Sequence, residues 1–295
     1  MPIDPTIFKA YDIRGTYPDQ INGEIARKIG YALAGYLNPK AIAVGRDMRE
    51  SSPEIFENLS AGIRDNGVDV IDLGLISTDG LYFAVGKFDY DGGVMITASH
   101  NPKQYNGLKI CRKHAIPLSG QEGLNNILEA IQQNDQNGKA PERGSIVRRD
   151  IADDYAEHCL SFVDSSKIKP FKIVIDAGNG MAGATLPPVL EKLPIEVVRL
   201  FFELDGSFPN HPASPIELEN LQDLKQAIAK HKADFGVAFD GDADRMFLMD
   251  KHGNQVGGDM VTALVSKSLL TKHSGETVLY NLICSNAVPE LVQKM

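Results

Sequence analysis

Residues 92–102 have the sequence Gly92-Gly-Val-Met-Ile-Thr-Ala-Ser-His-Asn-Pro102. The apolar run 94–96 predicts a short buried strand, and the small and polar residues after it predict a loop closed by the proline. Ser99 follows the end of this strand, where rigid scaffolds commonly place functional side chains. A hydroxyl in that place is a candidate nucleophile, and it needs a partner that activates it. That partner has to come from elsewhere in the chain.

Alternating strand and helix patterns surround this stretch and predict an α/β fold. Residues 41–73 and 172–201 share the order strand, small-residue loop, helix, strand, which indicates a weak internal repeat. Apolar periodicity predicts helices over 23–37, 53–66, 81–87, 121–133, 150–163, 180–193 and 217–232. Ser52 is the expected N-cap of the second helix, ahead of Pro53. The expected strands cover 41–44, 68–73, 94–96, 108–110, 172–176, 195–201, 235–239 and 246–249, and a polar loop is expected over 134–144.

These patterns divide the chain into residues 1–149, 150–255 and 256–295, with the helix over 150–163 bridging the first two parts. The third part is predicted to begin a further repeat, with a strand over 277–281 and a helix after Ser285. A half-built unit of this kind cannot bury its apolar face. We therefore expect the chain to be a fragment of a longer protein, or its last segment to be completed in another way.

Composition narrows the range of functions. With 30 Lys and Arg against 39 Asp and Glu, the net charge of −9 argues against a large nucleic-acid interface, which needs a basic face. No apolar run approaches the length of a membrane span. Cys111, Cys159 and Cys284 have no ligand or disulfide spacing, as expected for a cytoplasmic protein. An anionic substrate would need a local basic pocket, and basic residues lie near several predicted loops: Arg14, Arg46, Arg49, Lys109 and Arg245.

The most specific local pattern is Asp240-Gly-Asp242-Ala-Asp244, just beyond a predicted strand. Alternate side chains of an extended segment share one side, so three carboxylates can converge, and a divalent cation would offset their repulsion. An EF-hand is excluded because positions 6 and 12 are Arg245 and Lys251 instead of Gly and Glu. A phosphate oxygen completing the ligand set would suit Mg²⁺ and phosphoryl transfer.

Other motifs allow weaker interpretations. Gly178-Asn-Gly-Met-Ala-Gly183 matches the dinucleotide-binding pattern, with Glu203 near the expected place of the ribose carboxylate, but close strand–helix packing explains the glycines somewhat better. Ser99 and His100 are neighbours whose side chains point opposite ways, which argues against a hydrolase pair. The charged turn with Arg46, Asp47 and Arg49 and the isolated His211 receive no definite role. No P-loop motif is present.

Four motifs in order resemble the α-D-phosphohexomutases: Tyr11-Asp-Ile-Arg-Gly15, Gly45-Arg-Asp-Met-Arg-Glu-Ser-Ser52, Thr97-Ala-Ser-His-Asn-Pro102 and Asp240-Gly-Asp-Ala-Asp-Arg245. The first and third are similar to the phosphomannomutase/phosphoglucomutase branch. The resemblance implies consecutive similar α/β domains, each with a mixed, mainly parallel sheet between helices. It also implies a cytoplasmic enzyme that interconverts hexose 6-phosphate and hexose 1-phosphate through a phosphoserine, with hexose 1,6-bisphosphate as activator and intermediate.

The resemblance also implies roles for single residues. Ser99 would be the phosphoserine, and its phosphate oxygen would bind Mg²⁺ together with Asp240, Asp242 and Asp244. His100 and Lys109 would be candidates for proton transfer, and Arg14 and Arg245 would stabilise the transferring charge. Substrate-binding residues would be Tyr11, Arg14, Lys109 and Arg245.

The chain also departs from the family pattern. Ser77-Thr78-Asp79 replaces a usual proline-containing motif, and Asn286 follows Ser285 where a basic residue is common. Family members have four domains. The third domain's sugar-recognition loop and the fourth domain, which grips the second phosphate, are not found in this sequence. We therefore expect Mg²⁺ binding and phosphate on Ser99 but slow sugar turnover, with no prediction of mannose or glucose preference or of oligomeric state. The alternatives are a dinucleotide-binding oxidoreductase domain and a non-catalytic fragment that binds phosphosugar.

Overall fold

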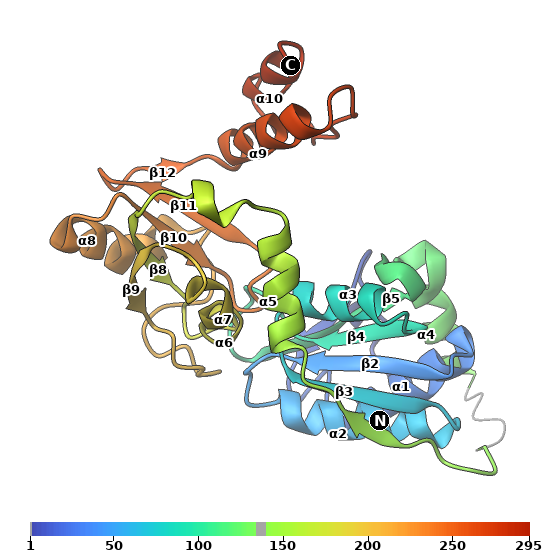
Figure 1. The fold of residues 1–295 in the computed structure, drawn as a ribbon. Coiled ribbons are helices and arrows are strands. Elements are labelled where there is room, and N and C mark those ends of the chain that lie inside the picture. The colour runs from blue at the N-terminus through green and yellow to red at the C-terminus, as the bar shows by residue number, and fades with distance from the viewer. Residues whose placement is uncertain (1, 134–139) are drawn as a thin grey trace.

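The computed structural model describes residues 2–133 and 140–295, and it contains two β-sheets with helices packed against them (Figure 1). The predicted α/β class, with mainly parallel sheets, is confirmed. The first sheet has the order β1-β5-β4-β2-β3-β7, with β6 paired to β5. Its strands are β1 (Ile13–Thr16), β2 (Ala41–Arg46), β3 (Asp69–Leu75), β4 (Gly92–Ile96), β5 (Tyr105–Arg112), β6 (Ile116–Pro117) and β7 (Ile146–Arg148).

Strands β4, β2, β3 and β7 are parallel, whereas β1 and β5 form an antiparallel edge. The chain passes from β2 to β3 on one side and then crosses to β4 on the other side of β2. Such a reversal of strand order opens a crevice at the carboxyl ends of the two strands, where ligands bind in open α/β sheets. The loops after β2 and β4 both begin at this crevice, and the second of them carries Ser99.

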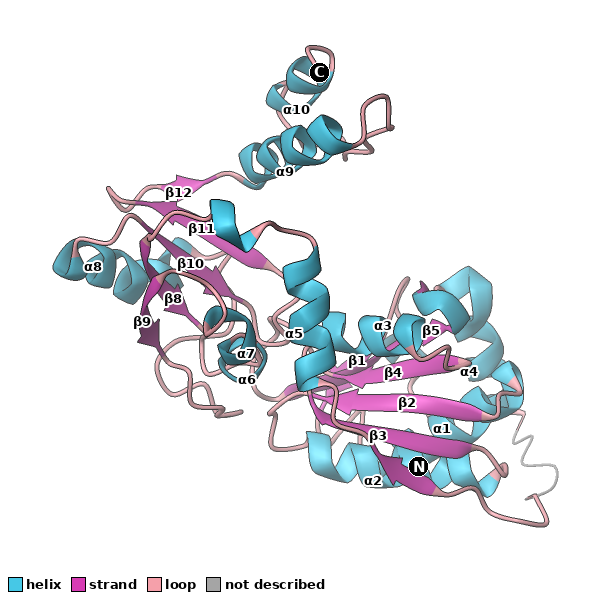
Figure 2. Cartoon of the chain, viewed as in Figure 1, coloured by secondary structure: helices cyan, strands magenta, loops and turns pink. Residues whose placement is uncertain are grey.

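Helices cover both faces of the first sheet (Figure 2). The helices α1 (Gly23–Leu37), α2 (Ser52–Asp65) and α4 (Asn125–Gln132) pack on one face, and α3 (Thr78–Lys87) packs on the other. Because successive strand residues point to opposite faces, Val94 and Ile96 join the α1/α2 core while Met95 joins the α3 core. This two-sided burial explains why β4 is a continuous apolar run.

The second sheet repeats this plan with fewer strands. Its order is β12-β11-β10-β8-β9, and β8 pairs in parallel with both β9 and β10. Its strands are β8 (Lys172–Asp176), β9 (Glu196–Leu200), β10 (Phe235–Phe239), β11 (Met246–Asp250) and β12 (Gln255–Val256). Helix α8 (Gln222–His231) packs on one face, and the short α6 (Ala182–Thr185) and α7 (Pro187–Leu190) lie toward the other. Strand order therefore reverses between β8 and β10, and the Asp240 loop leaves the sheet there.

Helix α5 (Ala152–Ser161) connects the two sheets and contacts both α3 and α7 (Figure 1). Its aromatic side chains pack on Phe83 of α3, with ring centroids 5.6 Å from Tyr155 and 4.8 Å from His158. The segment predicted over 150–163 thus forms one helix, and its contacts help to fix how the crevices of the two sheets lie.

Several local predictions were wrong. Ser52 is the first residue of α2 and not its cap, because its hydroxyl donates to Asp47 Oδ1 at 2.7 Å. The helix predicted to Leu193 is split into α6 and α7, since Pro187 lacks the N–H that a continuous helix would need. The α-helices predicted from 121 and from 217 begin only at Asn125 and Gln222, after an irregular turn over Gly120–Leu124 and a 3₁₀ helix over Leu218–Leu221.

The strand predicted over 277–281 does not form. A strand needs a neighbour to pair its N–H and C=O groups, and no described strand lies beside this segment. Most of its side chains are exposed, with Leu279 at 91%. The helices α9 (Gly258–Lys272) and α10 (Ala287–Val292) pack on each other nearby. Residues 134–139 of the predicted polar loop lie outside the described residues.

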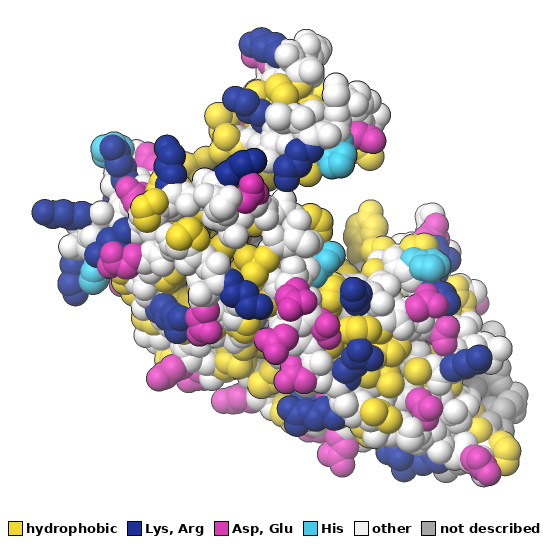
Figure 3. Space-filling view, viewed as in Figure 1, with side chains coloured by type: hydrophobic (Ala, Val, Ile, Leu, Met, Phe, Trp, Pro, Cys, Tyr) yellow, Lys and Arg dark blue, Asp and Glu magenta, His cyan; other side chains and the backbone are white. Residues whose placement is uncertain are grey.

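The distribution of charged side chains on the surface agrees with the sequence, which contains both basic and acidic residues in quantity. On the face shown in Figure 3, basic and acidic side chains are interspersed and do not form one basic area. Among the helices of the described ranges, none combines the length and apolarity that a membrane span requires.

Helices α1 and α2 approach backbone to backbone, which gives a test of the fold. A Cβ at Gly62 would lie 2.1 Å from the Arg27 carbonyl oxygen, whereas a Cβ at Gly35 of α1 meets nothing within 4 Å. We expect Gly62→Ala to lower the free energy of unfolding by about 1–3 kcal/mol through overpacking. Gly35→Ala, the matched control, should raise it by up to about 1 kcal/mol through helix propensity. Equal stabilities of the two variants in urea unfolding would contradict this packing.

Candidate active site

The two crevices bring Ser99 and the Asp240 loop into direct contact. The Ser99 hydroxyl donates to Asp240 Oδ2 at 2.9 Å, although the residues are 141 positions apart. Ser99 is 3% exposed and Asp240 is fully buried. The loops are so close that a Cβ at Gly241 would lie 2.6 Å from the Ser99 carbonyl oxygen. Only glycine at this position permits the approach without displacing backbone.

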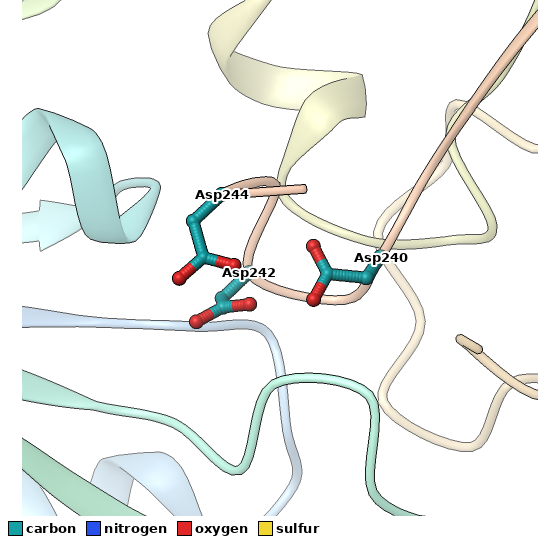
Figure 4. A group of neighbouring side chains, drawn as sticks. All are labelled: Asp240, Asp242 and Asp244. Atoms are coloured by element: carbon teal, nitrogen blue, oxygen red, sulfur yellow. The ribbon is translucent and has the colours of Figure 1, made fainter. Parts of the chain in front are cut away.

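The three carboxylates of the loop point toward one another (Figure 4). One oxygen from each of Asp240, Asp242 and Asp244 lies within 4.8 Å of the others. The sequence pattern predicted an extended segment here, and that prediction was wrong. Ala243 has a φ of +58°, and its N–H bonds the Asp240 carbonyl oxygen, so a tight turn produces the convergence.

This donor set fits a divalent cation. The Oδ1 atoms of Asp242 and Asp244 are buried, and within the described ranges neither has a hydrogen-bond partner. Buried oxygens without partners cost free energy, and a hard cation such as Mg²⁺ or Ca²⁺ accepts oxygen ligands of this kind. These carboxylates are therefore the residues that could hold a metal.

Burial and neighbouring charges shift the pKa values of Asp240 and Asp242 in opposite directions. Burial, together with the charges of Asp242 and Asp244, raises the pKa of Asp240 to about 7. Burial alone would also raise the pKa of Asp242, but the Lys109 ammonium and the hydrogen bonds to this carboxylate together outweigh burial and hold that pKa below its ordinary value. Lys109 Nζ lies 2.7 Å from Asp242 Oδ2 and 2.6 Å from Asp244 Oδ2. Burial opposes the charge on Lys109, yet the two carboxylates raise its pKa, so its amine is positively charged at neutral pH.

Arg245 connects the serine to His100. Its Nη2 contacts Ser99 Oγ and Asp240 Oδ2, and it lies 2.6 Å from His100 Nδ1. Because a guanidinium only donates, His100 Nδ1 is the acceptor and the proton of the neutral ring lies on Nε2. Burial, followed by the charges of Arg245 and Arg14, lowers the pKa of His100, which favours this neutral form.

The remaining predicted residues lie at the edge of the site. Arg14 Nη1 donates to Asn101 Oδ1 at 3.3 Å, and its Nη2 pairs with Asp12 at 2.5 Å. Tyr11 is 77% exposed, and the structure gives its side chain no hydrogen bond to any described residue. Arg14 therefore joins the serine loop, while Tyr11 is not drawn into it.

Sequence reasoning missed three contributors. Arg49, interpreted as part of a charged turn, is fully buried and donates to the Ser99 carbonyl oxygen at 2.9 Å. The Thr78 hydroxyl donates to Asp242 Oδ2 at 2.6 Å. His211 Nε2 lies 3.1 Å from the buried Asp176, in the loop beside the Asp240 turn. Of these three residues, only Arg49 had a signal in the sequence, because it is a charged residue that follows a buried strand by a few positions.

The structure favours packing over dinucleotide binding for the Gly178–Gly183 motif. A Cβ at Gly183 would lie 2.1 Å from the Phe202 carbonyl oxygen, and one at Gly180 would lie 2.8 Å from that of Gly241. The glycines thus make room for the chain's own backbone, including the Asp240 turn. The helix that follows, α6, has only four residues.

Comparison with known proteins agrees with this geometry. Two domain models match the chain: phosphoglucomutase/phosphomannomutase alpha/beta/alpha domain I over residues 5–138 and domain II over residues 153–253. The chain belongs to the phosphoglucomutase/phosphomannomutase family. The resemblance inferred from the four motifs is thereby confirmed.

Individual relatives support the same family. The chain is 43% identical over 274 residues to the phosphohexose mutases of Xanthomonas campestris pv. campestris, a match covering 93% of this chain and 61% of the relative. It is 37% identical to the phosphomannomutase of Escherichia coli K12, covering 94% and 62%. A crystal structure of a phosphoglucomutase/phosphomannomutase family protein from Burkholderia thailandensis superposes with a TM-score of 0.90 at 33% identity, covering 99% and 65%. The chain thus spans about three fifths of the length of the curated relatives it matches.

The acidity of Asp240 predicts pH-dependent cation binding. With a pKa of about 7, this carboxyl is mostly protonated at pH 6 and mostly ionised at pH 8. A proton and a cation compete for it, so Mn²⁺ or Mg²⁺ affinity should rise about tenfold from pH 6 to pH 8, with proton release. Calorimetric titration in buffers of different ionisation enthalpy measures both quantities. Asp240→Asn should bind more weakly and lose this pH dependence; an affinity of the unmodified protein that stays constant across this range would contradict the assignment.

Proposed function

We propose that this chain carries the phosphoryl-transfer site of a phosphohexomutase, which interconverts hexose 6-phosphate and hexose 1-phosphate through a phosphoserine at Ser99 and a hexose 1,6-bisphosphate. The observation that carries the proposal is the contact of one buried hydroxyl with a carboxylate and a guanidinium. The Ser99 hydroxyl donates to Asp240 and accepts from Arg245, beside two buried carboxylate oxygens that accept no hydrogen bond from any described residue. Family membership and the named mutase relatives support it.

In the proposed reaction, Ser99 Oγ attacks the phosphorus of a bisphosphorylated hexose. The bond from phosphorus to Ser99 forms, the bond from phosphorus to the sugar oxygen breaks, and the serine proton passes to Asp240 Oδ2. Asp240 Oδ2 already accepts a hydrogen bond from this hydroxyl, at 2.9 Å. The sugar oxygen gains a proton from a charged donor in the site, for which the Lys109 ammonium is the candidate because His100 is neutral. Return of the phosphate to the other sugar hydroxyl reverses each transfer.

Catalysis in this proposal depends mainly on charge. Phosphoryl transfer spreads negative charge over the phosphate oxygens, and preorganised cations stabilise it. Arg245 already touches the serine oxygen, Arg14 is held beside Asn101, and Lys109 projects from β5. Mg²⁺ held by Asp240, Asp242, Asp244 and the serine phosphate would supply further positive charge when bound.

The same proposal covers domains and ligands. Residues 1–149 would form the phosphoserine domain, residues 150–255 the metal-loop domain, and residues 256–295 the start of a third. The substrate would be a phosphorylated hexose with its 1,6-bisphosphate as activator. Relatives named phosphomannomutase favour mannose phosphate as one substrate. Tyr11, Arg14, Lys109 and Arg245 would bind it. The alternative in which this chain only binds phosphosugar gives a different result in the experiment below.

Intact mass measurement tests the proposal. Incubation with Mg²⁺ and glucose 1,6-bisphosphate should add about 80 Da, the mass of one phosphoryl group, at Ser99. Ser99→Ala should remove the adduct, and Asp240→Asn should slow its formation at least about 100-fold by weakening charge stabilisation and proton acceptance. Ser161→Ala, on the exposed side of α5, is the matched control and should be labelled like the unmodified protein. Absence of the adduct despite bound bisphosphate would instead support a non-catalytic binding protein.

A further inference from the structure

We propose that Arg49 is a positioning residue for the proposed phosphotransfer. It holds the phosphoserine loop, defined as residues 97–105, in the shape that aims Ser99 at Asp240. The role rests on the proposed function, but Arg49 acts through the loop backbone and does not touch the reacting atoms. The contacts of its guanidinium carry the argument.

The guanidinium of Arg49 binds carbonyl oxygens distributed along the phosphoserine loop. Its Nη2 donates to Ser99 at 2.9 Å and to Asn101 at 2.7 Å, and its Nη1 donates to Pro102 at 2.9 Å and to Tyr105 at 3.0 Å. Its Nε donates to Asp47 Oδ2 at 3.1 Å. A guanidinium has five N–H groups in a planar fork, and each has one acceptor here. The loop is thereby wrapped around a single fully buried cation.

The loop has a shape that needs such support. Ser99 has a φ of +53°, in the left-handed region that residues other than glycine seldom adopt. Strained positions of this kind persist where their surroundings over-determine them. The Ser99 carbonyl group belongs to a buried residue, and without the Arg49 donor it would lose this buried hydrogen bond, at a cost in free energy. Arg49 therefore stabilises the conformation in which the Ser99 hydroxyl reaches Asp240.

Arg49 is itself fixed from two sides. Within the first sheet's own loop, Asp47 Oδ2 accepts a hydrogen bond from Arg49 Nε. Asp47 Oδ1 accepts another from Ser52 Oγ at 2.7 Å, which holds the carboxylate in place. From the second-sheet side, the Phe208 ring lies 5.2 Å from the guanidinium carbon. A Cβ at Gly206 would lie 2.7 Å from Arg49 Cα, so the same loop also presses on the Arg49 backbone. The loop that follows β9 thus covers the residue that shapes the phosphoserine loop.

Lysine cannot replace this arrangement. An ammonium donates three hydrogen bonds from one point, whereas these acceptors surround a planar fork. Arg49→Lys keeps the charge opposite Asp47 but loses the distribution of donors along the loop. The matched control is Arg46→Lys, at the last residue of β2 and three positions before Arg49. Arg46 pairs with Asp72 at 2.8 Å and stacks on Phe56, and it makes no described contact with the phosphoserine loop.

Amide hydrogen exchange followed by mass spectrometry tests the proposal without requiring turnover. The amides of Thr97, Ser99, Asn101 and Tyr105 are hydrogen-bonded within the site and should exchange slowly. Peptides covering 97–107 should exchange at least about tenfold faster in Arg49→Lys, while peptides covering α1 and β8 stay unchanged. Arg46→Lys should leave the 97–107 peptides unchanged. Equal exchange in Arg49→Lys and the unmodified protein, or faster exchange throughout the chain, would overturn the positioning role.

Chemical rescue distinguishes donor geometry from charge. In Arg49→Ala, millimolar guanidinium should restore slow exchange over 97–107, whereas methylammonium at the same concentration should not. Rescue by both cations, or by neither in a folded variant, would overturn the proposal. The rate of Ser99 phosphorylation should follow the exchange result, falling at least about tenfold in Arg49→Lys. An unmodified protein that takes up no phosphate would count against the proposed function alone, since the exchange experiment does not depend on it.

Discussion

Charge compensation among groups from two sheets is the constraint on which this site depends. Three carboxylates with oxygens within 4.8 Å of one another would repel if they stood alone. Lys109 reaches Asp242 and Asp244 from the first sheet, while Arg245 covers Asp240 from within the same turn. The first-sheet cation and the second-sheet anions thus need each other. The ion pairs that join the two halves of the chain are therefore the same ion pairs that assemble the site.

Topology explains why these groups can meet. Both sheets reverse strand order next to a central strand, and both functional loops leave their sheets at that reversal. The open ends of two α/β sheets therefore face each other with a serine on one side and carboxylates on the other. Small residues at the contact, above all Gly241, allow backbone to approach backbone. The fold supplies position, and a few charged side chains supply the chemistry.

Local patterns predicted much of this arrangement. Strands 172–176 and 235–239 have the predicted bounds because each is an apolar run between polar or glycine-rich segments. The Asp240 turn was found because its three carboxylates are close in sequence. The contacts of Arg49 could not be predicted in this way, since its carbonyl partners lie 50 to 56 residues away. Thr78 and Asp242 are 164 residues apart. The segment 277–281 was wrongly predicted as a strand for a related reason. An apolar pattern in one segment does not supply the neighbouring strand that pairing requires.

We propose that Ser99 and the Asp240 turn form one cation-binding phosphotransfer site. Anomalous diffraction from crystals soaked in Mn²⁺ tests it most directly, because the ion is located without reference to activity. One strong peak is expected within about 2.0–2.2 Å of oxygens from Asp240, Asp242 and Asp244, distances typical of small hard cations, on the side of the turn that faces Ser99. No peak at the turn, or a peak bound by other residues while the three carboxylates keep their present hydrogen bonds and ion pairs, would contradict it.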